Sequence, residues 1–412
     1  TLDAGGAAQA TVLLPSDPYL LATTVSFQAV AGSPIDAASN VVRLTAAVAG
    51  TFEPTLDAPD LPIVEGAVAP TDDGTFLFVG GSGPVAQEYD PDLEEWTTAG
   101  ATFAVGTLGR STTLADGRIL FTGGIDPTGQ PTAAAAVWDP ATGQSTSLAM
   151  GSPRAGHGAS LLPDGRVLIT GGFQTVDLTD LLTFFSGIQG TTELFDPSTG
   201  TFAAGPGLFE PRALHSSTTT TAGKVLIAGG LTLVPILNVP TVSNTAYLFS
   251  NGSFGLPSFF DAPRMLHAAC ALPGGKVLLV GGLSLDLTAV IQSGDLTQLV
   301  VGTLDDGQVF TAGFLGGTFS AVTGLGAGRA GAGVVALPGG DVLIAGGIDV
   351  ALSAGGVQID LPTSADRYDG SATFQPTGAL GAGRFLPVLT PLPDGTVLVA
   401  GGGAASAEVY QP

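Results

Sequence analysis

Three histidines, five tyrosines and one cysteine are the residues of this chain that could support metal-dependent chemistry. His157, His215 and His267 each stand three residues after an arginine, so they occupy one equivalent position in three consecutive segments. If these imidazoles converged, they could hold a copper or other transition-metal ion. Instead of metal binding, we expect each of these repeated histidines to make a structural hydrogen bond within the framework of the fold.

Five arginines share a second repeated position, 17 residues before a glycine pair: Arg154, Arg212, Arg264, Arg329 and Arg384. They could form a cationic ring for an anionic ligand, or they could pack and pair with backbone or carboxylate groups. Carboxylates such as Asp305 and Asp306 could bind calcium, but the alternating ligand spacing of a calcium loop is absent. The chain also lacks a phosphate-binding glycine loop, a Gly-x-Ser-x-Gly elbow and a His-Glu-x-x-His motif.

The composition limits the partners and the compartment. Only 12 of 412 residues are Lys or Arg, and the formal net charge is −23. Nucleic acid is therefore not expected as a partner, because phosphate binding needs clustered cations. The single cysteine, Cys270, excludes an internal disulfide and a cysteine zinc cluster. The sequence contains no run of about 20 apolar residues of the kind that forms a transmembrane helix. We expect a secreted or cell-surface protein, with any export signal or anchor outside residues 1–412.

An internal repeat determines the predicted architecture. A short apolar strand ends in a glycine pair seven times, and the first glycines are Gly80, Gly123, Gly171, Gly229, Gly281, Gly346 and Gly401. An aromatic residue stands ten residues before four of the repeat arginines, at Phe202, Phe254, Phe319 and Phe374. Ile63 and Gly106 replace the arginine in the first two units. Each unit predicts four antiparallel strands, the second ending at the glycines and the fourth carrying the aromatic.

With its double glycine, its Arg and His before the first strand and its aromatic in the fourth, the sequence resembles the kelch-repeat β-propeller family from about residue 50 onward. The resemblance implies an all-β, seven-bladed propeller with four-stranded antiparallel blades. It is specific for architecture and says little about function.

The ends of the repeat predict how the ring is closed. Only eleven residues follow Gly401, so the last blade lacks its fourth strand, whereas the segment around Phe52 matches the pattern of that strand. We expect this N-terminal strand to close the last blade and to remove exposed sheet edges. Residues 49–412 then form the propeller. Residues 1–48 contain three short alternating runs, at 10–14, 24–30 and 41–45, and form an extra β segment, either the end of a sandwich domain or an assembly arm.

Galactose oxidase is the kelch-type enzyme against which the chain can be compared, because its copper is bound by two His and two Tyr, one Tyr cross-linked to Cys. Cys270 lies three residues after His267 with no Tyr near it in the sequence, and four of the five tyrosines occupy strand positions of the repeat. The motif of the copper site is therefore not carried over. A galactose oxidase-like metal-dependent oxidase remains the alternative function.

In four of the later units, the loop between the second and third strands is longer than in the first unit. The spacing from the first glycine to the next aromatic is 16 residues at Gly80 but 31, 25, 38 and 28 in four later units. Because antiparallel strands alternate in direction, these loops between the second and third strands emerge on the same face as the Arg and His positions. They carry apolar residues that include Leu182, Phe184, Phe185, Ile236, Leu237, Ile291 and Val300.

Two fates are open for this apolar loop surface. The loops could fold over one another or extend the second and third strands, or the surface could contact a partner. We expect a non-catalytic binding or assembly module that uses the long-loop face and the arginines beside it for another protein or for a second copy. Carbohydrate binding is the further alternative. Neither a cofactor nor a metal is expected.

Overall fold

The computed structural model describes residues 24–31, 37–45, 49–59, 67–71, 74–79, 85–101, 106–176, 187–234, 239–286, 300–313, 316–353 and 356–412. Contacts divide the chain into two units, Thr1–Thr51 with Gln411, and Phe52–Tyr410 with Pro412. In the first unit, β1 (Thr24–Ala31) pairs antiparallel with β2 (Ala37–Thr45). These strands cover the runs expected at 24–30 and 41–45, and the run at 10–14 lies outside the described residues.

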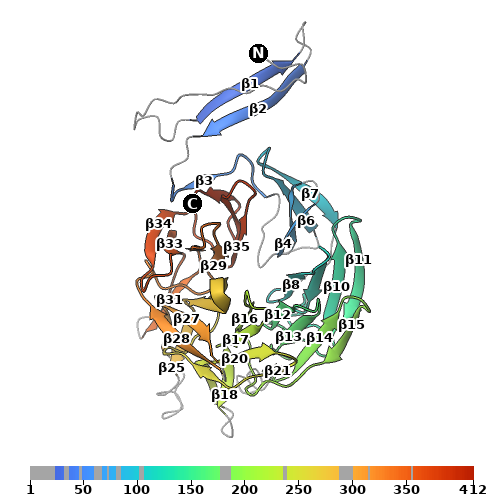
Figure 1. Ribbon diagram of the computed structural model, residues 1–412, viewed down its shortest axis with the longest axis vertical. Helices are drawn as coiled ribbons and strands as arrows, with labels where there is room; N and C mark the ends of the chain where they lie inside the picture. The colour runs from blue at the N-terminus through green and yellow to red at the C-terminus, as the bar shows by residue number, and fades with distance from the viewer. Residues whose placement is uncertain are drawn as a thin grey trace. The chain divides into compact units, whose positions relative to one another are not determined.

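The second unit is built from antiparallel sheets that follow the predicted repeat (Figure 1). Seven of them, called the repeat sheets below, share one order of four strands among the described residues. The first two sheets are β4 (Ala67–Pro70), β5 (Phe76–Val79), β6 (Val85–Asp90) and β7 (Glu95–Ala101), then β8 (Arg110–Thr113), β9 (Ile119–Thr122), β10 (Ala134–Asp139) and β11 (Gln144–Ala149). The next three are β12 (Gly158–Leu161), β13 (Val167–Thr170), β14 (Thr192–Asp196) and β15 (Thr201–Ala204); β16 (Ser216–Thr219), β17 (Val225–Ala228), β20 (Thr245–Ser250) and β21 (Ser253–Phe254), with β22 (Ser258–Phe259) also on β20; and β23 (Ala268–Leu272), β24 (Lys276–Val280), β27 (Gly307–Ala312) and β28 (Gly317–Val322). The last two are β29 (Gly333–Ala336), β30 (Val342–Ala345), β33 (Ser364–Tyr368) and β34 (Gln375–Ala379), then β35 (Pro387–Pro391), β36 (Val397–Gly401), β37 (Glu408–Tyr410) and β3 (Phe52–Pro54). A 3-10 turn, Pro273–Gly275, connects β23 to β24.

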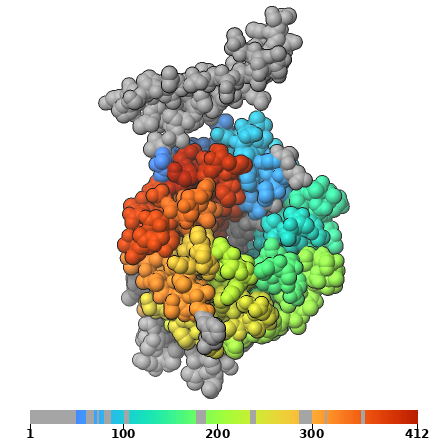
Figure 2. Space-filling model, viewed as in Figure 1, coloured from blue at the N-terminus to red at the C-terminus, as the bar shows by residue number. Residues whose placement is uncertain are grey.

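The repeat sheets stand around a common centre, and their colours follow the chain order in the space-filling view (Figure 2). Their first strands contact one another in the order β4, β8, β12, β16, β23, β29 and β35, and β35 also contacts β4. The second strands β9, β13, β17, β30 and β36 are buried along their whole length, and β24 is buried after its first residue, Lys276. A strand covered on both faces is expected to be continuously apolar, which explains the Val-Leu-Ile runs before the glycine pairs.

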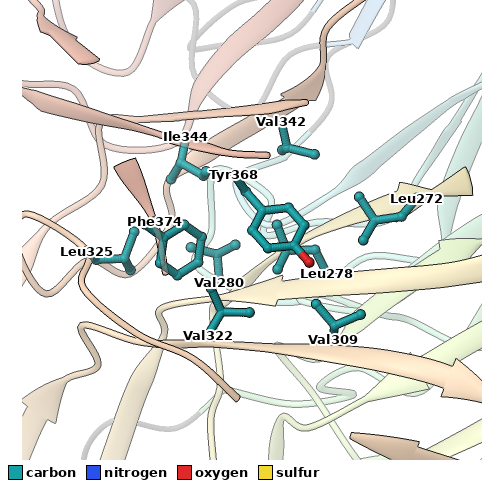
Figure 3. Packing of buried hydrophobic residues seen from close by; sticks show 10 residues of the cluster. All are labelled: Leu272, Leu278, Val280, Val309, Val322, Leu325, Val342, Ile344, Tyr368 and Phe374. Atoms are coloured by element: carbon teal, nitrogen blue, oxygen red, sulfur yellow. The ribbon is translucent and has the colours of Figure 1, made fainter. Parts of the chain in front are cut away.

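Neighbouring repeat sheets pack face to face through apolar side chains (Figure 3). One such cluster joins Leu278 and Val280 of β24 to Ile344 of β30 and to Tyr368 and Phe374 of the same neighbouring sheet. The aromatic ring of Phe374 packs closely against Gly307. A Cβ atom added to Gly307 would lie only 2.7 Å from the Cζ atom of Phe374. The repeat aromatic therefore fills the space between two sheets.

The strand around Phe52 pairs with the C-terminal sheet as the repeat predicts. Phe52 lies opposite Tyr410, and Pro54 lies opposite Glu408. The rings of Phe52 and Tyr410 are 4.9 Å apart, close to the 4.8 Å between Phe195 and Phe202 in an earlier repeat sheet. β3 thus contributes the aromatic contact that the fourth strand contributes elsewhere.

A chain of backbone hydrogen bonds connects successive repeat sheets beside their first strands. The residue two positions after each repeat arginine, or after Gly106, has a left-handed backbone: Leu108, Gly156, Leu214, Leu266, Gly331 and Leu386. From Gly156 to Leu386, each donates its N–H to the carbonyl of the equivalent residue in the preceding sheet, at 2.7–3.0 Å. Leucine in this conformation costs free energy, so the surrounding structure must hold it there.

In the part of the chain that the structure describes, no helix has the length and apolarity needed to span a bilayer.

Candidate interaction surface

The repeat arginines form a structural frame inside the sheets. Each side chain is fully buried, and each Nη1 donates to the carbonyl of the glycine 17 residues later, at 2.7–3.2 Å. The strict spacing found in the sequence is therefore the length of a loop closed by this hydrogen bond. A positive φ at those glycines, such as φ 60° at Gly171, lets the carbonyl face the guanidinium.

A carboxylate balances every buried guanidinium. Arg154, Arg329 and Arg384 pair with Glu193, Asp366 and Glu408 of the third strand, at 2.7–3.0 Å. Arg212 and Arg264 instead pair with Glu210 and Asp306, because Tyr247 and Gln308 occupy the third-strand position. Burial lowers the pKa of Arg154, Arg212, Arg264 and Arg329, and the neighbouring carboxylates oppose that shift.

This frame corrects one use suggested for the arginines. They were candidates for a cationic ring on the binding face, but their guanidinium groups are enclosed within the sheets, where each is paired with a carboxylate. A ligand on the protein surface does not reach them. The two sheets without the arginine carry Gln87 and Ala136 at the position of the carboxylate, so neither member of the ion pair is retained there.

The three histidines link neighbouring repeat sheets. The Nε2 atoms of His157, His215 and His267 lie 2.8 Å from hydroxyl oxygens of Thr122, Thr170 and Ser216, each in the preceding sheet. Their Nδ1 atoms are buried without a hydrogen bond of good geometry. Burial, with nearby arginine charge as the second cause, lowers the pKa of all three, to about 3 for His267.

Each Nε2 is engaged with a hydroxyl group of the neighbouring sheet, so as they stand these imidazoles do not offer their Nε2 atoms to a copper ion. Within the described ranges, no three His, Cys, Asp or Glu side chains are grouped so that they could hold a metal ion. Burial also raises the pKa of the half-buried Cys270 thiol to about 11, which favours its protonated form at neutral pH.

Two hollows lie at equivalent places between the repeat sheets, on the side of the turns that join first to second and third to fourth strands. One is lined by residues that include Glu88, Asp116 and Trp138, the other by Asp164, Lys224 and Asn251. Because the same turns form both, they are a consequence of the repeat rather than one specialised pocket.

The long loops build a second apolar layer on the side of the histidines. Bridges join Ala213 to Leu231, Met265 to Leu283 and Ala330 to Ile348, so the base of each loop lies beside the residue that follows a repeat arginine. These residues form one core with Phe173, Ile188 and Val242. The long loops therefore emerge on the same side of the sheets as the Arg and His positions, as predicted.

Two of the loops combine into one additional sheet. Residues between the second and third strands form β18 (Leu231–Val234) with β19 (Val239–Val242), then β25 (Leu283–Asp286) with β26 (Val300–Thr303), then β31 (Asp349–Ser353) with β32 (Gly356–Asp360). The last four strands make one sheet in the order β25-β26-β31-β32, called the loop sheet below. The described parts of these loops thus pair with one another as strands, as one of the two predicted fates required.

The predicted loop residues fall into two groups. Val300 is exposed, with 55% of its surface accessible. The other named residues lie outside the described ranges: Leu182, Phe184, Phe185, Ile236, Leu237 and Ile291.

The outer strand of the loop sheet is the exposed apolar element that the sequence analysis missed. Every residue of β32 is exposed, Val357 by 60% and Ile359 by 63%, and Leu361 just after it by 48%. Val350, opposite Ile359, packs into the core of the second layer. The alternation Val-Gln-Ile-Asp-Leu was the available sequence signal, because it is typical of a strand with one apolar face.

Comparisons with known proteins bear on the fold. No protein-family model matches the chain, and no curated protein matches it. A solved structure described as "Structure of YjhT" is similar over 74% of this chain and 99% of that chain, with a TM-score of 0.53 and 16% identity. Another, "Novel fungal alcohol oxidase with catalytic diversity among the AA5 family, in complex with copper", covers 75% of this chain and 74% of that chain, with a TM-score of 0.42 and 16% identity. The chain has a β-propeller-like all-β fold.

Proposed function

We propose that the chain is a secreted or cell-surface, non-catalytic binding and assembly module. In this proposal the repeat sheets are the seven blades of a closed kelch-type propeller, and the loop sheet is its contact surface. The closure is supported by the contact of β35 with β4 and by the pairing of β3 with β37. The secreted location rests on the composition, with few cations and a net charge of −23.

One observation carries the binding role: the loop sheet ends in an edge strand, β32, with uncovered apolar side chains. Edge strands with free N–H and C=O groups readily pair with another chain, and proteins usually protect them with lysine, proline or a bulge. β32 contains no lysine, proline or bulge, and its one charged residue, Asp360, stands at its last position. An apolar edge with so little protection is best explained as a contact surface.

The non-catalytic part of the proposal rests on how the reactive residue types are used. The arginines and histidines nearest the long-loop side are bonded within and between the sheets, and the Cys270 thiol is kept protonated. What the second layer leaves exposed on β32 is apolar side chains and backbone edge.

Site-specific photocrosslinking tests the proposal. Gln358, exposed in β32, is replaced by benzoylphenylalanine, and the matched control places it at Gln144, which is exposed in β11 at the outer edge of a repeat sheet. The protein is irradiated in the medium or on the surface of its source cells, and adducts are identified by mass spectrometry. We expect one specific adduct from position 358 and none from position 144. Equal labelling at both positions, or none at either, would contradict a binding role of the loop sheet.

A further inference from the structure

The occupant of the β32 edge can be inferred from its own sequence and register. We infer that β32 pairs with β32 of a second copy, antiparallel and about a twofold axis at Gln358, so that two loop sheets join into one. This inference rests on the proposed function and specifies its partner. Three properties of the strand carry it: the direction of its free backbone groups, the symmetry of its side chains and the distribution of its charge.

The direction of the free groups follows from the β31–β32 hairpin. Ser353 lies opposite Gly356, with only two residues between them, and the pairing continues to Asp349 opposite Asp360. In a two-residue hairpin the closing pair exchanges both backbone hydrogen bonds, and bonded and non-bonded pairs then alternate. Gly356, Gln358 and Asp360 therefore bond inward to β31. Val357 and Ile359 direct their N–H and C=O groups outward.

A twofold axis at Gln358 uses all of these outward groups. It places Val357 of one copy opposite Ile359 of the other, twice, and Gln358 opposite its own counterpart. Since Val357 and Ile359 carry the outward groups, both of these pairs are of the bonded type and the central Gln358 pair is of the non-bonded type, as an antiparallel ladder requires. Such a contact is isologous and closed, so it forms a dimer rather than a fibre.

The side chains match in the same register. Val357 and Ile359 lie on the face of the loop sheet that carries Val350 and Val301, both packed in the second-layer core. Pairing with the second copy would continue this apolar row across the axis. The two Gln358 amides would meet on the other face, where they can donate and accept across the axis.

Charge is arranged so that two acidic chains can approach here. β32 holds one charged residue, Asp360, and the twofold register places it opposite Gly356 of the other copy rather than opposite its own counterpart. Like charges directly across two strands would be destabilising. Five residues a side form a small interface of the weak, transient class, so we expect dimers that depend on protein concentration.

Cysteine crosslinking tests the register in the full chain, with Cys270→Ala as the background. Gln358→Cys places two thiols in the central pair, where Cα atoms are about 4.5 Å apart and a disulfide can form. The matched control, Asp360→Cys, shares the strand and the exposure but lies away from its counterpart. We expect a disulfide-linked dimer from Gln358→Cys under mild oxidation, at least ten times faster than from Asp360→Cys.

Sedimentation velocity over a concentration series tests the same contact without chemistry. Ile359→Lys is compared with Val300→Lys, which makes the same charge change at a 55% exposed valine of the loop sheet. Both substitutions reduce the net negative charge, which by itself favours association. We expect Ile359→Lys to raise the dimer dissociation constant at least tenfold and Val300→Lys less than twofold.

The possible failures separate the two proposals. A dimer that forms in the wild type but is unaffected by Ile359→Lys, or equal crosslinking at positions 358 and 360, overturns the β32 pairing. A chain that is monomeric at every concentration also overturns it. If such a monomer still gives a specific adduct from position 358 to another protein, the proposed binding role stands and only the second copy as partner is refuted.

Discussion

The buried pair Arg329–Asp366 gives the sharpest prediction about the frame that positions the long loops. Among the described residues, Asp366 is the one carboxylate bonded to Arg329, and Asp366→Ala removes it; the Arg329 side chain is fully buried, and that of Asp366 is 1% exposed. Burial lowers the pKa of Arg329 and raises the pKa of Asp366, so each group depends on the other for its charge. The remaining partners of the guanidinium are the Ser364 hydroxyl and the carbonyls of Ala327, Gly346 and Ser364.

Leaving a charge buried without its partner costs about 3–5 kcal/mol, whereas removing an exposed ion pair costs about 0–1 kcal/mol. The same region offers the matched control: Arg367, next to Asp366, pairs with Asp341 at 3.4 Å, and these side chains are 43% and 29% exposed. We therefore expect Asp366→Ala to lower the free energy of unfolding by about 3–5 kcal/mol. Asp341→Ala should lower it by about 1 kcal/mol or less.

The single variant Arg329→Leu and the double variant Arg329→Leu/Asp366→Ala complete the cycle. Because the double variant removes the charge that Asp366→Ala leaves behind, its cost should be smaller than the summed costs of Arg329→Leu and Asp366→Ala by about 1 kcal/mol or more. Unfolding in guanidinium chloride, followed by circular dichroism, measures all four proteins and the wild type. If Asp366→Ala costs no more than Asp341→Ala, the arginine frame is not the structural element described above.

Three further predictions concern other parts of the protein. Burial lowers the pKa of the three histidines in the folded chain, so the unfolded chain takes up protons at a higher pH. The free energy of unfolding should therefore fall as the pH drops below about 6.5. In calorimetry between about pH 6.5 and 5, His267→Ala should make this fall less steep. An unchanged slope would refute the role of His267 as a buried neutral link. Deleting residues 1–56 removes β3 and should lower the melting temperature strongly, whereas deleting 1–46 should leave it nearly unchanged; equal melting temperatures would contradict closure by β3. With its pKa raised to about 11, Cys270 should react with a thiol reagent at pH 8 at least ten times more slowly in folded than in denatured protein, and equal rates would contradict its burial.

The fold was largely predictable because the repeat encodes its own hydrogen bonds. The spacing of 17 residues between arginine and glycine, as from Arg154 to Gly171, recurs in five units because each guanidinium donates a hydrogen bond to the carbonyl of that glycine. The aromatic at Phe202 recurs because it stacks against the third strand. Phe52 could be assigned to the C-terminal sheet for the same reason, although more than 350 residues separate it from Tyr410.

The arrangement of the long loops was predictable only in part. Loop length and apolar content identified the side on which the loop strands gather, but the pairing of β26 with β31 joins loops from two different units, and no local pattern encodes that contact. The role of the arginines was left open, because spacing alone does not say whether a guanidinium faces a sheet interior or a ligand. β32 was missed because its residues alternate within a loop that was judged by length, and exposure depends on which strands cover it.

Residue-resolved hydrogen exchange at β32 tests the central claim most directly, because neighbouring amides of one strand face opposite ways. In dilute protein we expect the amide of Gln358 to be protected by its bond to β31, and the amides of Val357 and Ile359 to exchange freely. In the assembled protein, the amides of Val357 and Ile359 should slow at least tenfold while that of Gln358 changes little. Free exchange at Val357 and Ile359 in the assembled form, or no difference between dilute and concentrated protein, would contradict the loop sheet as the contact surface.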